Sequence, residues 1–161
     1  MGFKVLKVCD RDAQFLCRLM NDQSILDALN EVSTKLCDWI DAISAWNDDP
    51  DEEDYILFDE QTPVGWLGVN GLLSEDKTAY IKMVALLPQY QNNGLGTRAV
   101  HWCLDNLKSR EYETVILYTN RNNVRAQNCY AKCGFKVTEE LTEEMSNGDI
   151  VKRYKMECTL S

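Results

Sequence analysis

The sequence has few of the residues that mark a metal site, a secreted protein or a membrane span. It contains one histidine, three prolines and seven cysteines, and no two cysteines are separated by two residues. An odd cysteine count with a single histidine disfavours a zinc site and a disulfide framework. The longest apolar run, residues 83–87, is far shorter than the roughly 20 residues of a membrane-spanning helix, and no secretory signal pattern opens the chain. We therefore expect reduced, structural cysteines, no metal, no membrane partner and a cytoplasmic location.

Positive charge is also scarce. The chain has 17 Lys and Arg against 26 Asp and Glu, for a net charge of −9, which disfavours a nucleic-acid ligand because phosphate contacts need a basic surface. Six acids fall within residues 48–54 and four within residues 139–144. These segments either attract a cationic substrate or form solvated acidic loops, and we expect the loops.

The hydrophobic pattern predicts an α/β (α+β) fold with helices and strands in a mixed order. The length favours a single domain over residues 1–161. Spacings of two predict strands and spacings of three and four predict helices. The expected strands are 3–8, 55–58, 63–72, 79–87, 113–119, one beginning at 135–137, and 150–158; the expected helices are 10–20, 25–46 with a break near 33–34, 97–107 and 122–133. These elements amount to about seven strands and four helices.

A polar loop with two glycines separates the apolar strand 79–87 from the helix after it. Such a loop at a helix N-terminus presents unpaired N–H groups and favours a phosphate. The loop lacks the Gly-x-x-x-x-Gly-Lys-Ser/Thr pattern of a P-loop. Residues 94–99 match the Gly-x-Gly-x-x-Ala dinucleotide pattern, but too little chain remains to build a doubly wound sheet around it. Residues 91–96 match a third pattern, Gln/Arg-x-x-Gly-x-Gly/Ala.

This third pattern resembles the coenzyme A pyrophosphate loop of the GNAT superfamily of N-acetyltransferases. Residues 123–135 resemble the family's Asn-x-x-Ala-x-x-x-Tyr-x-x-x-Gly-Phe segment, in the correct order along the chain. The resemblance is firm over residues 79–137 and extends to the order of elements elsewhere. It implies a sheet that is splayed between its fourth and fifth strands, and transfer of an acetyl group from acetyl-CoA to a primary amine of a small molecule or a peptide N-terminus.

The resemblance also implies the site residues. The main chain of Val84, Ala85 and Leu86 would bind the pantetheine arm. Tyr130 would protonate the departing thiolate, Asn123 would bind the pantetheine and Lys132 would reach the 3′-phosphate. Relatives often carry Arg or Lys where this chain has asparagines in the loop, so we expect Arg98 and Arg125 to supply charge. The pyrophosphate would lie on the main chain of the loop, which consists of Gln91, Asn92, Asn93, Gly94, Leu95, Gly96, Thr97 and Arg98.

The general base stays open. Relatives that use a glutamate carry it at positions that are Tyr80 and Tyr118 in this chain, and neither phenol is a good base near neutral pH. Glu31, Asp27 or a water chain are the other candidates. A non-catalytic acetyl-CoA sensor or interaction module on the same fold, and a nucleotide-binding enzyme, are the alternatives to an acetyltransferase. A homodimer is an expected assembly.

Overall fold

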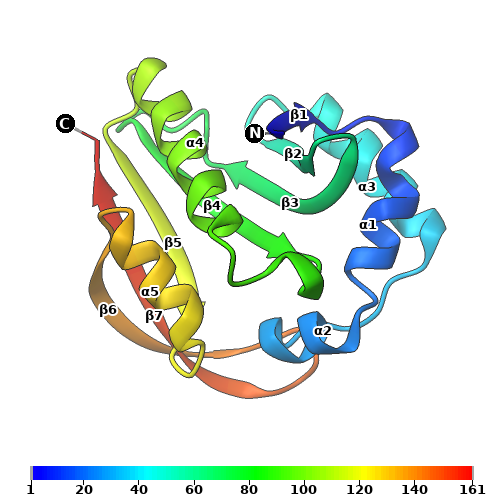
Figure 1. Cartoon of the computed structure of the whole chain (residues 1–161). Helices are drawn as coiled ribbons and strands as arrows, with labels where there is room; N and C mark the ends of the chain where they lie inside the picture. The colour runs from blue at the N-terminus through cyan, green and yellow to red at the C-terminus, as the bar shows by residue number, and fades with distance from the viewer. Residues whose placement is uncertain (1, 161) are drawn as a thin grey trace.

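The computed structural model describes residues 2–160. Seven strands form one mixed sheet in the order β1-β2-β3-β4-β5-β7-β6 (Figure 1). The parallel pair in this sheet is β4–β5, and every other neighbouring pair is antiparallel. One parallel pair cannot make a doubly wound sheet, so the dinucleotide alternative for residues 94–99 is wrong. The strands are β1 (Phe3–Lys7), β2 (Glu53–Asp59), β3 (Thr62–Asn70), β4 (Thr78–Leu86), β5 (Thr114–Asn120), β6 (Lys136–Glu144) and β7 (Ile150–Thr159).

The structure has five α-helices in residues 2–160, where the sequence predicted about four. The expected helix over 25–46 is interrupted at 30–35, a segment that contains the predicted break near 33–34, so it forms two helices. Helix α2 ends at Asn30 in the left-handed conformation with φ 53°. The Asn30 carboxamide accepts a hydrogen bond from the side chain of Asn120 at 2.6 Å, which holds the chain away from a helical path. The helices are α1 (Ala13–Leu19), α2 (Gln23–Leu29), α3 (Leu36–Asp48), α4 (Leu95–Ser109) and α5 (Val124–Lys132), with short 3-10 turns at Asp10–Asp12 and Pro88–Tyr90.

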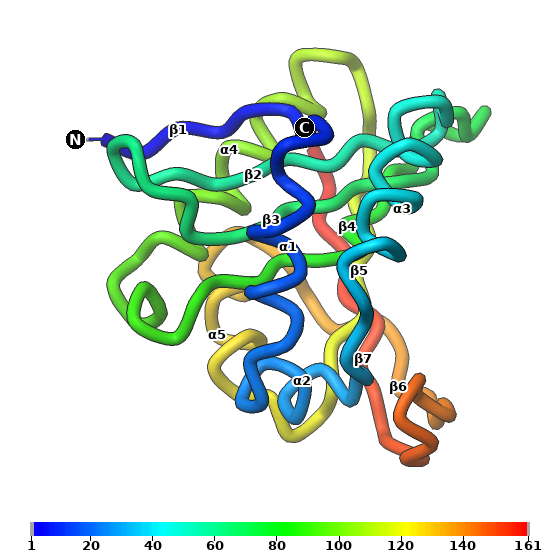
Figure 2. The backbone as a smooth tube through the Cα atoms, turned by 90° about the vertical axis from the view of Figure 1, so that its right-hand side faces the viewer, coloured from blue at the N-terminus to red at the C-terminus, as the bar shows by residue number. Residues whose placement is uncertain are grey.

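The helices cover the sheet on both faces. Figure 1 shows α4 and α5 in front of the strands, and Figure 2 shows α1 and α3 over the other face. Helix α4 buries the stripe that its spacing predicted against β3, β4 and β5. Trp39 and Ile43 of α3 pack with Ile56 of β2 and Trp66 of β3 in a separate core. Each face of the sheet therefore carries its own hydrophobic core.

The sheet is splayed between β4 and β5, as the family resemblance implied. Pairing is confined to Thr78–Tyr80 of β4 and Thr114–Ile116 of β5. Beyond Tyr80 the two strands diverge, which Figure 1 shows as a widening gap. β4 keeps its pairing with β3 as far as Leu86, across a register shift between Gly68 and Val69. The free side of β4 therefore exposes main-chain groups that an extended ligand can pair with.

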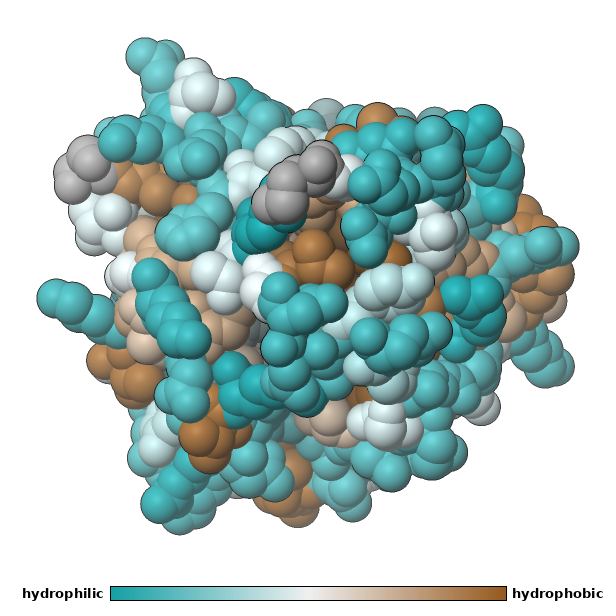
Figure 3. All heavy atoms as spheres, viewed as in Figure 1, coloured by the Kyte–Doolittle hydropathy of each residue, from teal (hydrophilic) through white to brown (hydrophobic). Residues whose placement is uncertain are grey.

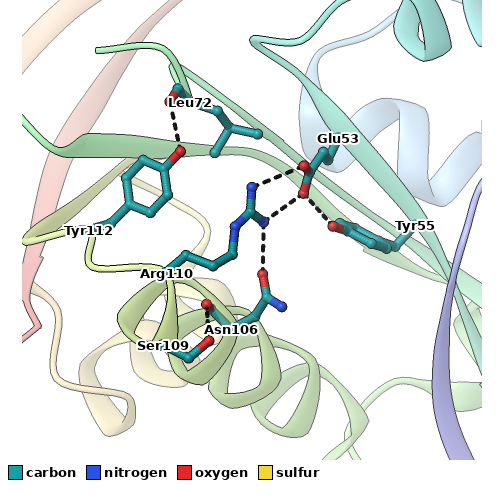
Figure 4. A network of polar contacts seen from close by, with 7 residues as sticks. All are labelled: Glu53, Tyr55, Leu72, Asn106, Ser109, Arg110 and Tyr112. Atoms are coloured by element: carbon teal, nitrogen blue, oxygen red, sulfur yellow. Dashed lines mark hydrogen bonds and ion pairs between the residues drawn. The ribbon is translucent and has the colours of Figure 1, made fainter. Parts of the chain in front are cut away.

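The acidic segment 48–54 is only in part the solvated loop that we expected, because Asp48 and Asp49 are exposed but the acids after them are not. Its last residues enter β2, and Asp54 is 2% exposed. Glu53 binds the Arg110 guanidinium through both carboxylate oxygens at 2.8 and 3.0 Å and accepts a hydrogen bond from Tyr55, so it ties the C-terminal end of α4 to β2 (Figure 4). The acids of 139–144 are exposed as expected, but they lie on the edge strand β6 rather than in a loop.

The surface is largely hydrophilic on the face that carries α4 and α5. Figure 3 shows hydrophobic side chains there only as small areas between charged and polar ones. In residues 2–160 no helix combines the length and the apolar character that crossing a bilayer requires.

Candidate active site

A cavity of about 570 Å³ opens where β4 leaves β5. The end of β4, the glycine loop, the start of α4, helix α5 and helix α2 form its wall. The sequence placed most of these residues in one site although they come from segments that are far apart along the chain. Of the predicted residues, the structure brings into this wall Val84, Ala85, Leu86, Gln91, Asn92, Gly94, Gly96, Thr97, Asn123, Tyr130 and Lys132.

The glycine loop presents main-chain amides to this cavity. Gly94 is the N-cap of α4 with φ +87°, a conformation that glycine adopts at no steric cost. The first hydrogen bond of the helix runs from Arg98 N to Gly94 O, and Asn93 Oδ1 accepts from Leu95 N at 3.4 Å. The N–H groups of Gly96 and Thr97 lie before the helical ladder begins. This arrangement suits an anion such as a pyrophosphate.

Three predicted residues lie outside the cavity wall. Leu95 is buried in the core, and the Asn93 side chain is used within the loop. The Arg98 guanidinium lies over the Phe3 ring, 4.7 Å from its centroid, so it does not supply charge to the cavity as we expected. The positive charge of the cavity wall therefore comes from Arg125 and Lys132, which both line the cavity.

Helix α5 contributes Asn123 and Tyr130. Asn123 caps the helix, because its Oδ1 accepts a hydrogen bond from Ala126 N at 3.3 Å; this bond does not use the side-chain NH₂ group. The Tyr130 ring packs edge-on against Phe135 with centroids 6.0 Å apart. Burial raises the pKa of Tyr130 above its ordinary value, with the Cys129 thiol as a smaller cause. The phenol therefore keeps its proton at neutral pH, which a general acid requires.

None of the four side chains proposed as general base lines the cavity. Tyr118 is 39% exposed with the Arg153 guanidinium over its ring, and Tyr80 lies at the last β4–β5 pair. The carboxylate of Glu31 accepts from Ser146 Oγ at 2.7 Å, and that of Asp27 accepts from Gln23 at 2.7 Å. The base therefore stays open between these residues, water and groups that the sequence did not single out.

The sequence missed the part of the wall that α2 supplies and also missed Cys129. Helical spacing indicated that α2 is amphipathic, but no local signal places Ser24, Ile25, Ala28 and Leu29 beside α5. Cys129 Sγ lies 3.5 Å from Thr97 Oγ1 at the start of α4. The neighbouring Cys133 thiol, then the Thr97 hydroxyl and the charge of Lys132, lower the pKa of Cys129 to about 6. The position of Cys129, one residue before the motif tyrosine Tyr130, was the only feature of the sequence that could have indicated its place in the site.

This geometry predicts that coenzyme A protects Cys129 from alkylation. The thiolate reacts with iodoacetamide, and its lowered pKa favours labelling at pH 7, while a pyrophosphate at Gly96 and Thr97 would cover the sulfur. Peptide mass spectrometry with and without coenzyme A should show slower labelling of Cys129 and unchanged labelling of Cys37, which is exposed on α3. Equal labelling of Cys129 in both samples would contradict the placement of the pyrophosphate.

Comparison with known proteins agrees with this site. The sequence model of the Acetyltransferase (GNAT) family matches residues 16–135. N-alpha-acetyltransferase 30 of Schizosaccharomyces pombe is 31% identical over 75 residues, which cover 47% of this chain and 50% of that protein. Streptothricin acetyltransferase of Escherichia coli is 28% identical over 134 residues, which cover 82% of this chain and 76% of that protein. The chain thus spans only half the length of the first relative and about three quarters of the second.

Solved structures share the whole fold. Spermidine N-acetyltransferase of Vibrio cholerae, crystallised with CoA and spermine, superposes with a TM-score of 0.89 at 18% identity, covering 99% of this chain and 96% of that one. An acetyltransferase of Thermus thermophilus superposes with a TM-score of 0.81 at 20% identity, covering 99% and 98%. At such low sequence identity these structures show only that the fold is shared. Common ancestry with the family is shown by the match of its sequence model to residues 16–135. The splayed sheet, the glycine loop and the matched segment agree: this chain belongs to the GNAT family of acetyltransferases.

Proposed function

We propose that the protein transfers the acetyl group of acetyl-CoA to a primary amine in the cavity beside β4. Membership of the GNAT family confirms the predicted transferase class and co-substrate. The observation that carries the proposal is the single cavity that joins the free end of β4, the amides of the glycine loop and the Tyr130 phenol. These are the three parts that acetyl transfer needs: a support for the thioester, a phosphate site and a proton donor.

The cofactor would lie with its pantetheine arm along Val84 to Leu86 and its pyrophosphate on the amides of Gly96 and Thr97. In this pose the cations of Arg125 and Lys132 face the adenosine phosphates. An amide of β4 would polarise the thioester carbonyl. Attack by the amine nitrogen forms the C–N bond, the C–S bond breaks, and Tyr130 gives its proton to the coenzyme A thiolate.

The test of this function is turnover with a panel of amines. Purified protein is incubated with acetyl-CoA and each amine, and the free thiol of coenzyme A and the acetylated product are measured by absorbance and mass spectrometry. We expect both products in equal amounts for at least one amine. If calorimetry shows that coenzyme A binds but no amine of the panel gives product, the sensor or interaction module is favoured instead. No feature of the described residues supports that alternative at present.

The acceptor class follows from the relatives and from proton chemistry. The relatives are named N-alpha-acetyltransferase, streptothricin acetyltransferase and spermidine N-acetyltransferase, and two of these names specify transfer to nitrogen. At pH 7, freeing the nitrogen of a lysine-like amine costs about 4.6 kcal/mol against about 1 kcal/mol for an α-amine, from pKa values near 10.4 and 7.8. We infer that small amines and peptide N-termini of low pKa are favoured.

We expect an unblocked peptide without lysine to be acetylated faster at pH 7 than the same peptide with a blocked N-terminus and one lysine. The product is located by fragmentation in the mass spectrometer. The gap between the two peptides should narrow as the pH rises, because the lysine nitrogen then loses its proton in solution. Faster acetylation of the lysine peptide at pH 7 would overturn this preference.

We place the protein in the cytoplasm. Two features support this location: the described residues include seven free cysteines, which suit a reducing compartment, and the family uses acetyl-CoA. A homodimer also remains a proposal, and light scattering of the purified chain tests it.

A further inference from the structure

A cluster of carboxylates and indoles lies on the face of the sheet opposite α4. We call it the carboxylate–indole cluster, and it consists of Trp46, Glu52, Asp54, Trp66 and Lys82. Trp66 Nε1 donates a hydrogen bond to Asp54 Oδ1 at 2.8 Å. The Lys82 ammonium lies 3.2 Å from the same oxygen, forms an ion pair with Glu52, and sits over the Trp46 ring, 4.2 Å from its centroid.

The sequence makes room for this cluster with a glycine and a bulge. A Cβ on Gly68 would lie 2.6 Å from Asp54 Oδ1 and 2.6 Å from Lys82 Cε, so a larger residue there would have to displace these side chains. The register shift between Gly68 and Val69 leaves Lys82 as the extra residue of β4. Bulges re-aim side chains and are frequent beside active sites. Here the bulge lies where β4 has just left β5.

One oxygen of the cluster has no partner. Asp54 is 2% exposed, and its Oδ2 is buried without a hydrogen bond in the described chain. An isolated buried carboxylate oxygen is costly, and a proton shared with the adjacent Glu52 carboxyl removes the cost. Burial, and then Glu52, raise the pKa of Asp54 to about 8, against the opposing effect of Lys82. The charged groups that face Asp54 are Glu52 and Lys82, and β3 adds the Trp66 indole.

No residue of the cluster lines the cavity itself, and Trp66 is the member whose strand partner does. Trp66 pairs across the sheet with Ala85, which lines the cavity, and both belong to the core beneath α1 and α3. The cofactor loop and α4 occupy the other face. An amine that approaches the thioester from the face opposite α4 therefore arrives on the side of the sheet that carries Trp66 and Lys82. Glu52 is the more open of the two acids, with 13% of its side chain exposed against 1% for Asp54.

We propose that the Glu52–Asp54 carboxyl pair, in the molecules where it has released its shared proton, accepts the proton that the acceptor ammonium must lose before its nitrogen attacks the thioester. Neither carboxyl lines the cavity, so Glu52 receives the proton through a relay of water molecules past Trp66, and Asp54 is the positioning residue that shares it. The nitrogen lone pair then forms the C–N bond while the C–S bond breaks, and Tyr130 protonates the sulfur. This inference rests on the proposed function and names a base that the sequence left open.

The test is the pH dependence of kcat/KM for Asp54→Asn and Glu52→Gln. The substrate is an amine of the panel with a pKa of about 10.4, so that the pKa of the amine lies well above that of the carboxyl pair. Both changes keep the volume of the side chain, and an asparagine Oδ1 can still accept from Trp66. Glu53→Gln is the matched control, because Glu53 loses the same charge but contacts Arg110 and Tyr55 instead of the cluster (Figure 4). Coenzyme A affinity and the melting temperature are measured for each variant.

At pH 7 we expect Asp54→Asn and Glu52→Gln to lose roughly 10²-fold, the lower end of general acid–base catalysis. Between the pKa of the carboxyl pair and the pKa of the amine, the ratio of wild-type to variant kcat/KM should fall about tenfold per pH unit. In that range solvent deprotonates the acceptor, so the variant gains free amine as the pH rises. A loss that is equal at every pH, or no loss, would overturn the proposal. If the wild-type protein turns over no amine at all, the proposed function fails instead.

Stability gives a second readout that does not depend on turnover. A folded-state pKa raised above the ordinary 3.8 means that the folded protein holds a proton that the unfolded chain releases. The stability of the wild type should therefore fall as pH rises from about 4 to about 8. Asp54→Asn should lack this part of the decline. A parallel pH dependence in both proteins would show that no shared proton is held and would overturn the proposal even if the variant lost activity.

Discussion

Replacing Tyr130 with phenylalanine is expected to lower kcat by roughly 10²–10⁴, the usual range for loss of a general acid. Phenylalanine keeps the ring that packs against Phe135 and fills the same volume. It removes only the hydroxyl of a residue that lines the cavity and that burial keeps protonated. The melting temperature and the affinity for coenzyme A should hence stay close to those of the wild type. Steady-state kinetics, calorimetry and thermal unfolding of the same preparation measure all three.

A purely structural role for Tyr130 leads to the opposite expectation. The phenylalanine ring would then serve as well, and activity would survive. Tyr118→Phe and Tyr80→Phe are the controls, because each removes a phenol from a strand beside the splay without touching the cavity wall. Both should leave kcat largely intact. A loss well below roughly 10²-fold for Tyr130→Phe would mean that water protonates the leaving thiolate, while a large loss in a control would draw that tyrosine into the proton path.

The cofactor side of the site was predictable because its signals are local in sequence. Gly94 and Gly96 stand at a strand–helix turn, and Tyr130 stands at a fixed distance from Asn123 on one helix. Backbone geometry alone then places these groups at the carboxyl end of β4. Leu95 and Arg98 were included with the loop because they are next to it, but helical rotation turns one into the core and the other towards Phe3.

The acceptor side was not predictable, because long-range contacts decide it. The sequence predicted a break near 33–34, but it gave no sign that α2 would end earlier, at Asn30, whose carboxamide accepts a hydrogen bond from Asn120, 90 residues away. Asp54 is buried because Gly68 leaves room for it and Trp66 gives it a hydrogen bond. Within the chain, nothing near residue 54 distinguishes this aspartate from the five acids before it. Charge in a sequence therefore says little about solvation until the partners across the sheet are known.

Replacing Gly96 with valine is expected to weaken coenzyme A binding by about 10²-fold or more while leaving the fold intact. In the free protein a Cβ at this position would lie 3.7 Å from Leu86 Cδ1 and 3.8 Å from Cys129 Sγ, which are ordinary contacts. Valine is also no worse than glycine in a helix. Leu86 and Cys129, the residues nearest to that Cβ, both line the cavity, so we expect the valine methyl groups to take up space in it. Loss of one or two hydrogen bonds to a charged group, at about 1.5–3 kcal/mol each, gives the expected factor.

Gly94→Ala is the matched comparison, because it changes the loop by a different mechanism. No atom lies within 4 Å of a Cβ at Gly94, but φ is +87°, so alanine strains the backbone by roughly 1–2 kcal/mol. This variant should melt at a lower temperature, whereas Gly96→Val should not. Calorimetry with pantetheine, which lacks the pyrophosphate, gives the second control: its weak affinity should be the same for wild type and Gly96→Val. If Gly96→Val binds coenzyme A as the wild type does, the pyrophosphate does not lie on the amides of Gly96 and Thr97, and the cofactor must enter the cavity in another orientation.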